Sequence, residues 1–139
     1  RYAQTKMATA VPMGALRAPT SNAMSFVMQS FLDEVAHETG RDLPELLLEL
    51  VDGFEAEPEQ NGFFGKQPGF NPGRLRAVVK KATAMAGWGK QMPEGRALGF
   101  GYYYSHLGYF AEVVEVSINS RGNPAGCQRR GYRGHGQYA

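Results

Sequence analysis

The residue types best suited to binding chemistry lie together just before a strongly patterned helix. Three helix-capping residues, Thr20, Ser21 and Asn22, follow a proline, and this order predicts a helix that begins at residue 21 or 22. A helix N-terminus carries unpaired N–H groups and a partial positive charge, so beside Arg17 it suits an anionic group such as a phosphate. On spacing alone, a capped helix preceded by an arginine more commonly has a purely structural role.

Two helices follow this segment and should form a hairpin. The first has apolar residues at the spacing of one helix face and ends at Gly40. The second is predicted from the capping box at residues 42–45 to about Val51. Because only two residues link the helices, they should pack antiparallel. The apolar positions expected to be buried are Met24, Val27, Met28, Phe31, Leu32, Val35, Ala36, Leu46, Leu47 and Leu50.

A third helix is expected after a long loop at residues 52–73. The loop is rich in glycine, proline and phenylalanine, and a loop of this length is commonly functional or lies against a larger body. Asn71 and Pro72 cap the helix, and Gly87 ends it. Its basic residues are expected to form a solvated face. Its apolar stripe comprises Leu75, Val78, Val79, Ala82 and Met85.

The pattern then changes to two strands, at residues 97–105 and 109–118, with a turn at residues 106–108. Both faces of the second strand are mostly apolar, which predicts a strand buried on both sides within a larger sheet. Glu112 and Glu115 then need a partner or a position at an edge. The fold class expected from this order is α+β, with a helical hairpin and a third helix followed by a β-hairpin.

Composition excludes several kinds of site. The chain has 139 residues, a formal charge of +2 and one cysteine, Cys127, so it holds no internal disulfide framework and no cysteine-rich zinc or iron–sulfur site. Asp33 and His37 share a helix face without a third ligand, and we assign no metal site. No apolar run approaches the length of a membrane span. The sequence opens at Arg1, and we expect a fragment of a longer protein.

The last twenty residues differ from the rest. Residues 120–139 are rich in glycine and arginine and hold no acidic residue, so we expect a disordered tail or the product of a shifted reading frame. One alternative is an RNA-binding protein that acts through this tail by charge and tyrosine stacking. A second is a helical protein-interaction module that uses Met24, Met28 and Phe31.

Several separated blocks resemble one family in the same order. They are LRAPTSNA at residues 16–23, QSFLDEVA at 29–36, RLRAV at 74–78, GWGK at 87–90 and SHLGYFAEV at 105–113. Together they resemble the large subunit of molybdenum hydroxylases of the isoquinoline 1-oxidoreductase (beta subunit) and aldehyde oxidoreductase type, in the xanthine dehydrogenase superfamily. The resemblance implies that residues 1–119 are part of a molybdopterin-binding domain.

The resemblance also implies a cofactor and the residues near it. The cofactor would be molybdopterin, in its cytosine dinucleotide form, with molybdenum. Arg17 matches the family's cofactor-contacting arginine, and Ala18, Ser21 and Asn22 are further cofactor-binding candidates. Ala18 and Pro19 stand where the superfamily has a glycine and a substrate-stacking aromatic residue, which leaves the substrate open.

The activity implied is hydroxylation of N-heteroaromatic or aldehyde substrates, with a glutamate as base. That glutamate lies outside this chain in the family, and neither Glu112 nor Glu115 matches it, so the catalytic residues are unassigned and the fragment alone should be inactive. Electrons would leave through iron–sulfur clusters on a small partner subunit. A cytoplasmic and a periplasmic location both stay open.

Overall fold

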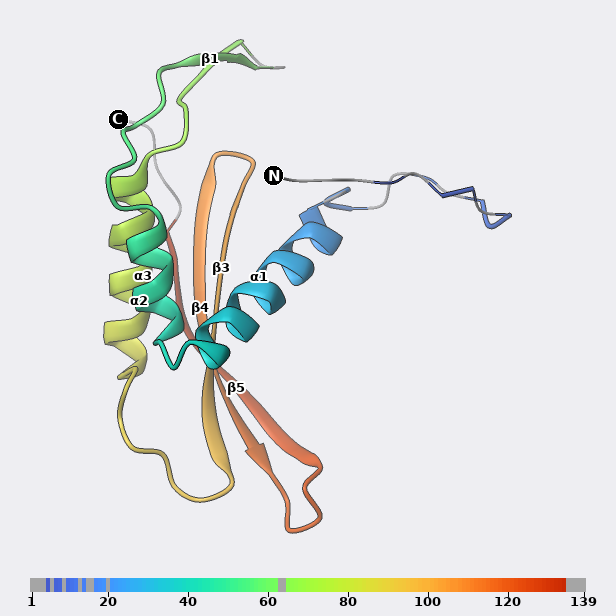
Figure 1. Cartoon of the computed structure of the whole chain (residues 1–139), viewed down its shortest axis with the longest axis vertical. Helices are drawn as coiled ribbons and strands as arrows, with labels where there is room; N and C mark the ends of the chain where they lie inside the picture. The colour runs from blue at the N-terminus through green and yellow to red at the C-terminus, as the bar shows by residue number, and fades with distance from the viewer. Residues whose placement is uncertain are drawn as a thin grey trace.

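The computed structural model describes residues 5, 7–8, 10–12, 14, 17–19, 21–62 and 65–134, and from residue 128 onward it describes the backbone alone. Over these residues the chain is an α+β structure, which confirms the predicted fold class (Figure 1). Its elements, in chain order, are α1 (Ser21–Glu38), α2 (Leu43–Leu50), β1 (Gln60–Gly62), β2 (Gly65–Gln67), α3 (Pro72–Ala86), β3 (Arg96–Ser105), β4 (Gly108–Ile118) and β5 (Pro124–Gly134).

The larger sheet is antiparallel, with β4 between β3 and β5. A two-residue turn of His106 and Leu107, both with positive φ, joins β3 to β4, and this confirms the predicted turn. Alternate residues of β4 from Tyr109 to Glu115 are buried. The helix α3 packs on β4 and β5, and α2 lies beside α3 (Figure 1). The short strands β1 and β2 form a small hairpin within the loop at residues 52–73.

The helix boundaries follow local signals that the sequence contains. Asp42 accepts a hydrogen bond from the Glu45 N–H at 3.1 Å, and Asn71 accepts one from the Arg74 N–H at 3.1 Å. Gly87 ends α3 in the left-handed conformation with φ of 65°. The predicted α1–α2 hairpin and the third helix are therefore confirmed.

The main core lies between the sheet and the pair α2 and α3. Leu75, Val79 and Ala82 of α3 are nearly or fully buried there. The other buried members are Leu47, Val51, Val78, Tyr102, Tyr109 and Ala111. A smaller cluster of Ala36, Leu43 and Leu46 holds the end of α1 against α2.

The apolar stripe of α1 is more exposed than the sequence predicts. Its C-terminal half packs through Leu32, Val35 and Ala36, whereas Val27 is 55% and Phe31 58% exposed. The reason is the position of α1, which crosses the sheet region obliquely, so that its first turns extend away from α2 and α3 (Figure 1). Met28, Leu50 and Met85, also expected to be buried, are exposed as well. No helix within the described ranges is long and apolar enough to cross a bilayer.

The strand β4 is fully buried on one face rather than on both. Its second face, with Phe110, Glu112 and Val114, is partly buried, and Val116 on that face is exposed. The difference arises because α3 packs on the face that carries Tyr109 and Val113. The prediction of burial on both sides is therefore wrong within the described residues.

The glycine- and arginine-rich tail also differs from expectation. Residues 124–134 form β5, which pairs with β4 from Tyr109 to Ile118, so the disorder predicted for residues 120–139 is wrong over this strand. Backbone hydrogen bonds to a neighbouring strand do not depend on side-chain type, and β4 offers such an edge. Residues 135–139 lie outside the described part of the chain, and the reading-frame hypothesis stays a prediction.

Candidate functional site

The segment that the sequence favours for binding forms a tight turn in front of α1. The side-chain amide of Asn22 donates to the Arg17 carbonyl at 3.0 Å, and the Asn22 backbone N–H donates to the Ala18 carbonyl at 3.2 Å. The Ser21 N–H donates to the Pro19 carbonyl at 2.8 Å. Asn22 therefore closes the turn and fixes where the Arg17 side chain leaves the backbone.

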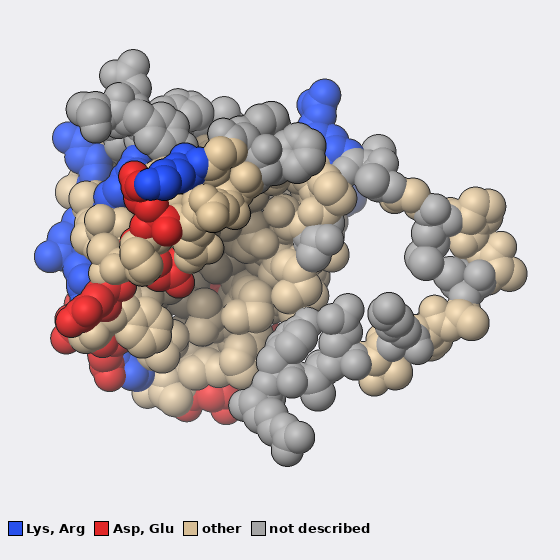
Figure 2. Space-filling model, turned by 90° about the horizontal axis from the view of Figure 1, so that it is seen from above, with Lys and Arg blue, Asp and Glu red and all other residues tan. Residues whose placement is uncertain are grey.

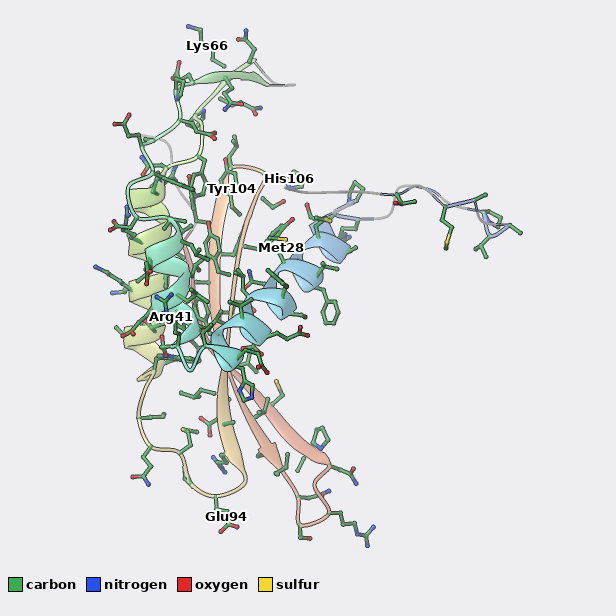
Figure 3. The ribbon with its side chains drawn as sticks, in the orientation of Figure 1. Met28, Arg41, Lys66, Glu94, Tyr104 and His106 are labelled. Atoms are coloured by element: carbon green, nitrogen blue, oxygen red, sulfur yellow. The ribbon has the colours of Figure 1, made fainter. Side chains whose placement is uncertain are left out.

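Ser21 connects this turn to the far end of the β3–β4 hairpin. Its Oγ lies 3.2 Å from Ser105 Oγ, and Ser105 Oγ lies 2.6 Å from His106 Nδ1. His106 therefore lies at the hairpin turn beside the first turn of α1 (Figure 3). Residues that are 84 positions apart in sequence meet at one end of the molecule.

Unusual backbone conformations gather at the same place. Among the described residues, the non-glycine residues with positive φ are Ala18 at 54°, His106 at 50° and Leu107 at 64°. Such conformations cost about 1–2 kcal/mol each and tend to occur at functional sites. The Ser21–Ser105 contact joins the two strained turns, so this end of the molecule is the candidate site.

A second contact holds α1 against β3 a little further along. Gln29 Oε1 accepts a hydrogen bond from the Tyr102 backbone N–H at 2.9 Å. A cavity of about 200 Å³ lies next to it, lined by residues that include Ser25, Tyr103, Phe110 and Glu112. Figure 2 looks onto this end of the molecule and shows a hollow lined mostly by uncharged residues, with acidic side chains to one side.

The electrostatics of the site favour an anion at the turn itself. Arg17 is exposed, and the first turn of α1 holds no acidic residue. Ser21 and Asn22 use their side chains within the protein, so they position the turn and its arginine. Within the described part of the chain, no group of three histidine, cysteine or acidic side chains is placed to hold a metal ion.

The two glutamates of β4 do not belong to the Arg17 turn. Glu115 is buried and accepts a hydrogen bond from Arg96 Nη1 at 2.8 Å, which provides the partner that the sequence required. Glu112 lines the cavity beside α1. Ser105 and His106 could not be recognised as site residues from the sequence, because a local turn pattern does not tell which helix end packs against it.

Ala18→Gly is expected to raise the free energy of unfolding by about 0.5 kcal/mol. Glycine removes the left-handed strain of about 1–2 kcal/mol, and the greater freedom of the unfolded chain offsets about 0.4–1 kcal/mol of that gain. Urea unfolding followed by circular dichroism measures the change.

The matched control is Ala84→Gly, on the exposed side of α3, where the same substitution should lower stability by about 1 kcal/mol. Equal destabilisation by the two glycines would contradict the strained conformation at Ala18.

Comparison with known proteins gives one informative similarity. The chain is 35% identical over 89 residues to the membrane-bound aldehyde dehydrogenase (pyrroloquinoline-quinone) of Gluconacetobacter polyoxogenes. The aligned part covers 62% of this chain and spans 11% of that protein. No protein-family profile and no solved structure matches the chain. The chain thus contains a region similar in sequence to part of an aldehyde dehydrogenase.

Proposed function

We propose that this chain is part of the large subunit of an oxidoreductase that acts on aldehydes or N-heteroaromatic compounds. In this proposal the turn at Arg17 contacts molybdopterin, in its cytosine dinucleotide form, and a small iron–sulfur subunit takes the electrons. The observation that carries it is the Arg17 turn, which is held by Asn22 and joined to Ser105 by Ser21. The similarity to an aldehyde dehydrogenase and the ordered sequence blocks support it.

The residues at the turn fit an anionic cofactor. Arg17 is exposed and precedes a helix whose first turn lacks acidic residues, so a phosphate there would meet a guanidinium and a helix N-terminus. Molybdopterin, when bound, would supply the two-electron oxidation chemistry. Arg17 would bind a phosphate of the cofactor, Asn22 would orient Arg17, and Ser21 would fix the turn against the β3–β4 hairpin.

Pyrroloquinoline quinone is a second candidate cofactor, because the similar protein carries it in its name. It is a carboxylate-bearing quinone, and its negative charge suits the same arginine and helix end. The two cofactors differ in a way that one sample can reveal, since only molybdopterin brings molybdenum.

The test is the cofactor content of the purified protein, with Arg17→Met as the variant. Molybdenum is measured by mass spectrometry and quinone by absorbance of the released cofactor. We expect the unmodified protein to hold molybdenum and Arg17→Met to retain at least about tenfold less, because a charged contact to a phosphate contributes about 1.5–3 kcal/mol. Arg121→Met, which removes an exposed arginine outside the turn, should keep the full content.

Each other result has a definite meaning. A protein that holds quinone but no molybdenum would show that the cofactor is pyrroloquinoline quinone and not molybdopterin. Equal molybdenum in the Arg17→Met and unmodified proteins would contradict the role of the turn. A protein that holds neither cofactor would overturn the proposal.

A further inference from the structure

A cavity of about 560 Å³ lies between the start of α2 and the end of α3. It shares no residue with the candidate site, and these two helix ends lie side by side (Figure 1). Cavities of about 300–1,000 Å³ bind small molecules in proteins, often between packed helices. The volume and the position therefore suit a ligand, and the lining residues decide its chemical class.

Trp88 lines this cavity and is held in place by two contacts. Its Nε1–H donates a hydrogen bond to Asp42 Oδ2 at 2.6 Å, and its ring meets the Phe100 ring at 6.0 Å between centroids. The second carboxylate oxygen of Asp42 accepts the Glu45 N–H at 3.1 Å. Because the indole N–H is already used, Trp88 offers a ligand the surface of its ring, and indole is the aromatic side chain that attracts cations best.

The side-chain charges around the cavity have one sign. Asp42 and Glu45 line it, and among the described residues of the lining none is basic. The last turn of α3 also ends here and holds no basic residue, so no side chain of that turn offsets the partial negative charge of the helix C-terminus. Lys81 and Lys90, the lysines nearest to this helix end in sequence, do not line the cavity. These features favour a cation over an anion.

The rest of the lining favours a cation that carries an apolar body. Leu48 of α2 and Val79 of α3 contribute aliphatic side chains, against which an alkyl chain would be buried. We propose that this cavity binds an organic cation with a primary ammonium group on an alkyl chain. The ammonium, with its three N–H donors, meets the carboxylates and the indole ring, and the alkyl chain packs on the aliphatic side chains. This site is independent of the proposed cofactor turn at Arg17.

The first test measures the fluorescence of Trp88, the single tryptophan of the chain, which therefore reports on this cavity. The probes are n-hexylammonium, 1-hexanol and hexanoate, which carry similar alkyl chains and differ in charge. At neutral pH and low salt, hexylammonium should give a saturable change, hexanol should bind about tenfold more weakly, and hexanoate should give no saturable change. Equal binding of hexylammonium and hexanol would overturn the recognition of a cation, and no saturable change with hexylammonium would overturn the site.

The second test locates the charge with Glu45→Gln. The Glu45 side chain is exposed, and its backbone N–H bonds the Asp42 cap, so the variant keeps the helix start and removes one charge from the cavity. Hexylammonium should bind about threefold more weakly to this variant, the effect of one exposed ion pair, while hexanol binding stays the same.

The matched control is Glu34→Gln, which removes an equal charge from an exposed position of α1 outside the cavity lining. This variant should bind hexylammonium as tightly as the unmodified chain. Equal losses in the two variants would show that net charge, and not the cavity, attracts the probe, which contradicts the proposal.

Discussion

Leu75→Ala is expected to lower the free energy of unfolding by about 3 kcal/mol, the largest loss for a single substitution considered for this chain. Leu75 on α3 is 2% exposed and belongs to the cluster that joins α2, through Leu47, to the sheet, through Tyr102 and Tyr109. The alanine removes buried apolar groups and leaves a cavity between elements that cannot close without moving apart. Domains of this size are stable by only about 5–15 kcal/mol, so the loss is a large fraction.

The matched control is Leu50→Ala. Leu50 lies at the end of α2, and its side chain is 50% exposed, so the same truncation should cost less than about 1 kcal/mol. Both leucines lie on stripes for which the sequence predicts burial. Urea unfolding followed by circular dichroism separates them, and equal losses would contradict the packing of α3 on the sheet.

The boundaries of the helices show where sequence reasoning succeeds. Helix starts and stops depend on neighbours in the chain, and so Asp42, Asn71 and Gly87 could be placed from local signals. The two-residue turn at His106 is equally local, since two extended runs need a short link.

What could not be predicted depends on contacts between distant segments. Periodicity shows that α1 has an apolar stripe, but it does not tell which part of the stripe a neighbour covers, and Val27 and Phe31 are exposed. Composition suggests disorder for the tail, yet the free edge of β4 offers backbone groups to pair with β5. In both cases the deciding interaction lies outside the local sequence window.

The candidate site likewise has a part that the sequence predicts and a part that only the folded chain shows. Arg17, Ser21 and Asn22 could be named from residue type and helix position. The roles of Ser21 and Asn22 could not, because Ser21 reaches Ser105 and Asn22 closes the turn on Arg17 only in the folded chain. His106 enters the site through the packing of α1 on the hairpin, which no local pattern specifies.

Removal of one hydroxyl group should have opposite effects on stability at two neighbouring tyrosines of the core, because only one of the two hydroxyls has a hydrogen-bond partner among the described residues. Tyr102→Phe is expected to raise the free energy of unfolding by about 1 kcal/mol, because its hydroxyl is buried without a hydrogen-bond partner among the described residues. Tyr109→Phe is expected to lower it by about 1–2 kcal/mol, because the Tyr109 hydroxyl accepts the Asn71 N–H at 2.7 Å at the start of α3. The rings stay in place in both variants, including the Tyr109 ring beneath the Arg74 guanidinium at 5.0 Å.

The pH dependence of stability provides a second measurement on the same pair. Burial raises the pKa of Tyr102, and the neighbouring Tyr109 and Tyr104 raise it further, so the folded chain keeps the phenol proton at a pH where the unfolded chain loses it. This contribution to stability is complete below about pH 10 and is lost as pH rises above it. Tyr102→Phe should therefore reduce the alkaline loss of stability, whereas Tyr109→Phe leaves Tyr102 to titrate. If both variants destabilise the chain equally at pH 7, the Tyr102 hydroxyl has a partner that balances its burial, and the expectation for Tyr102→Phe is wrong.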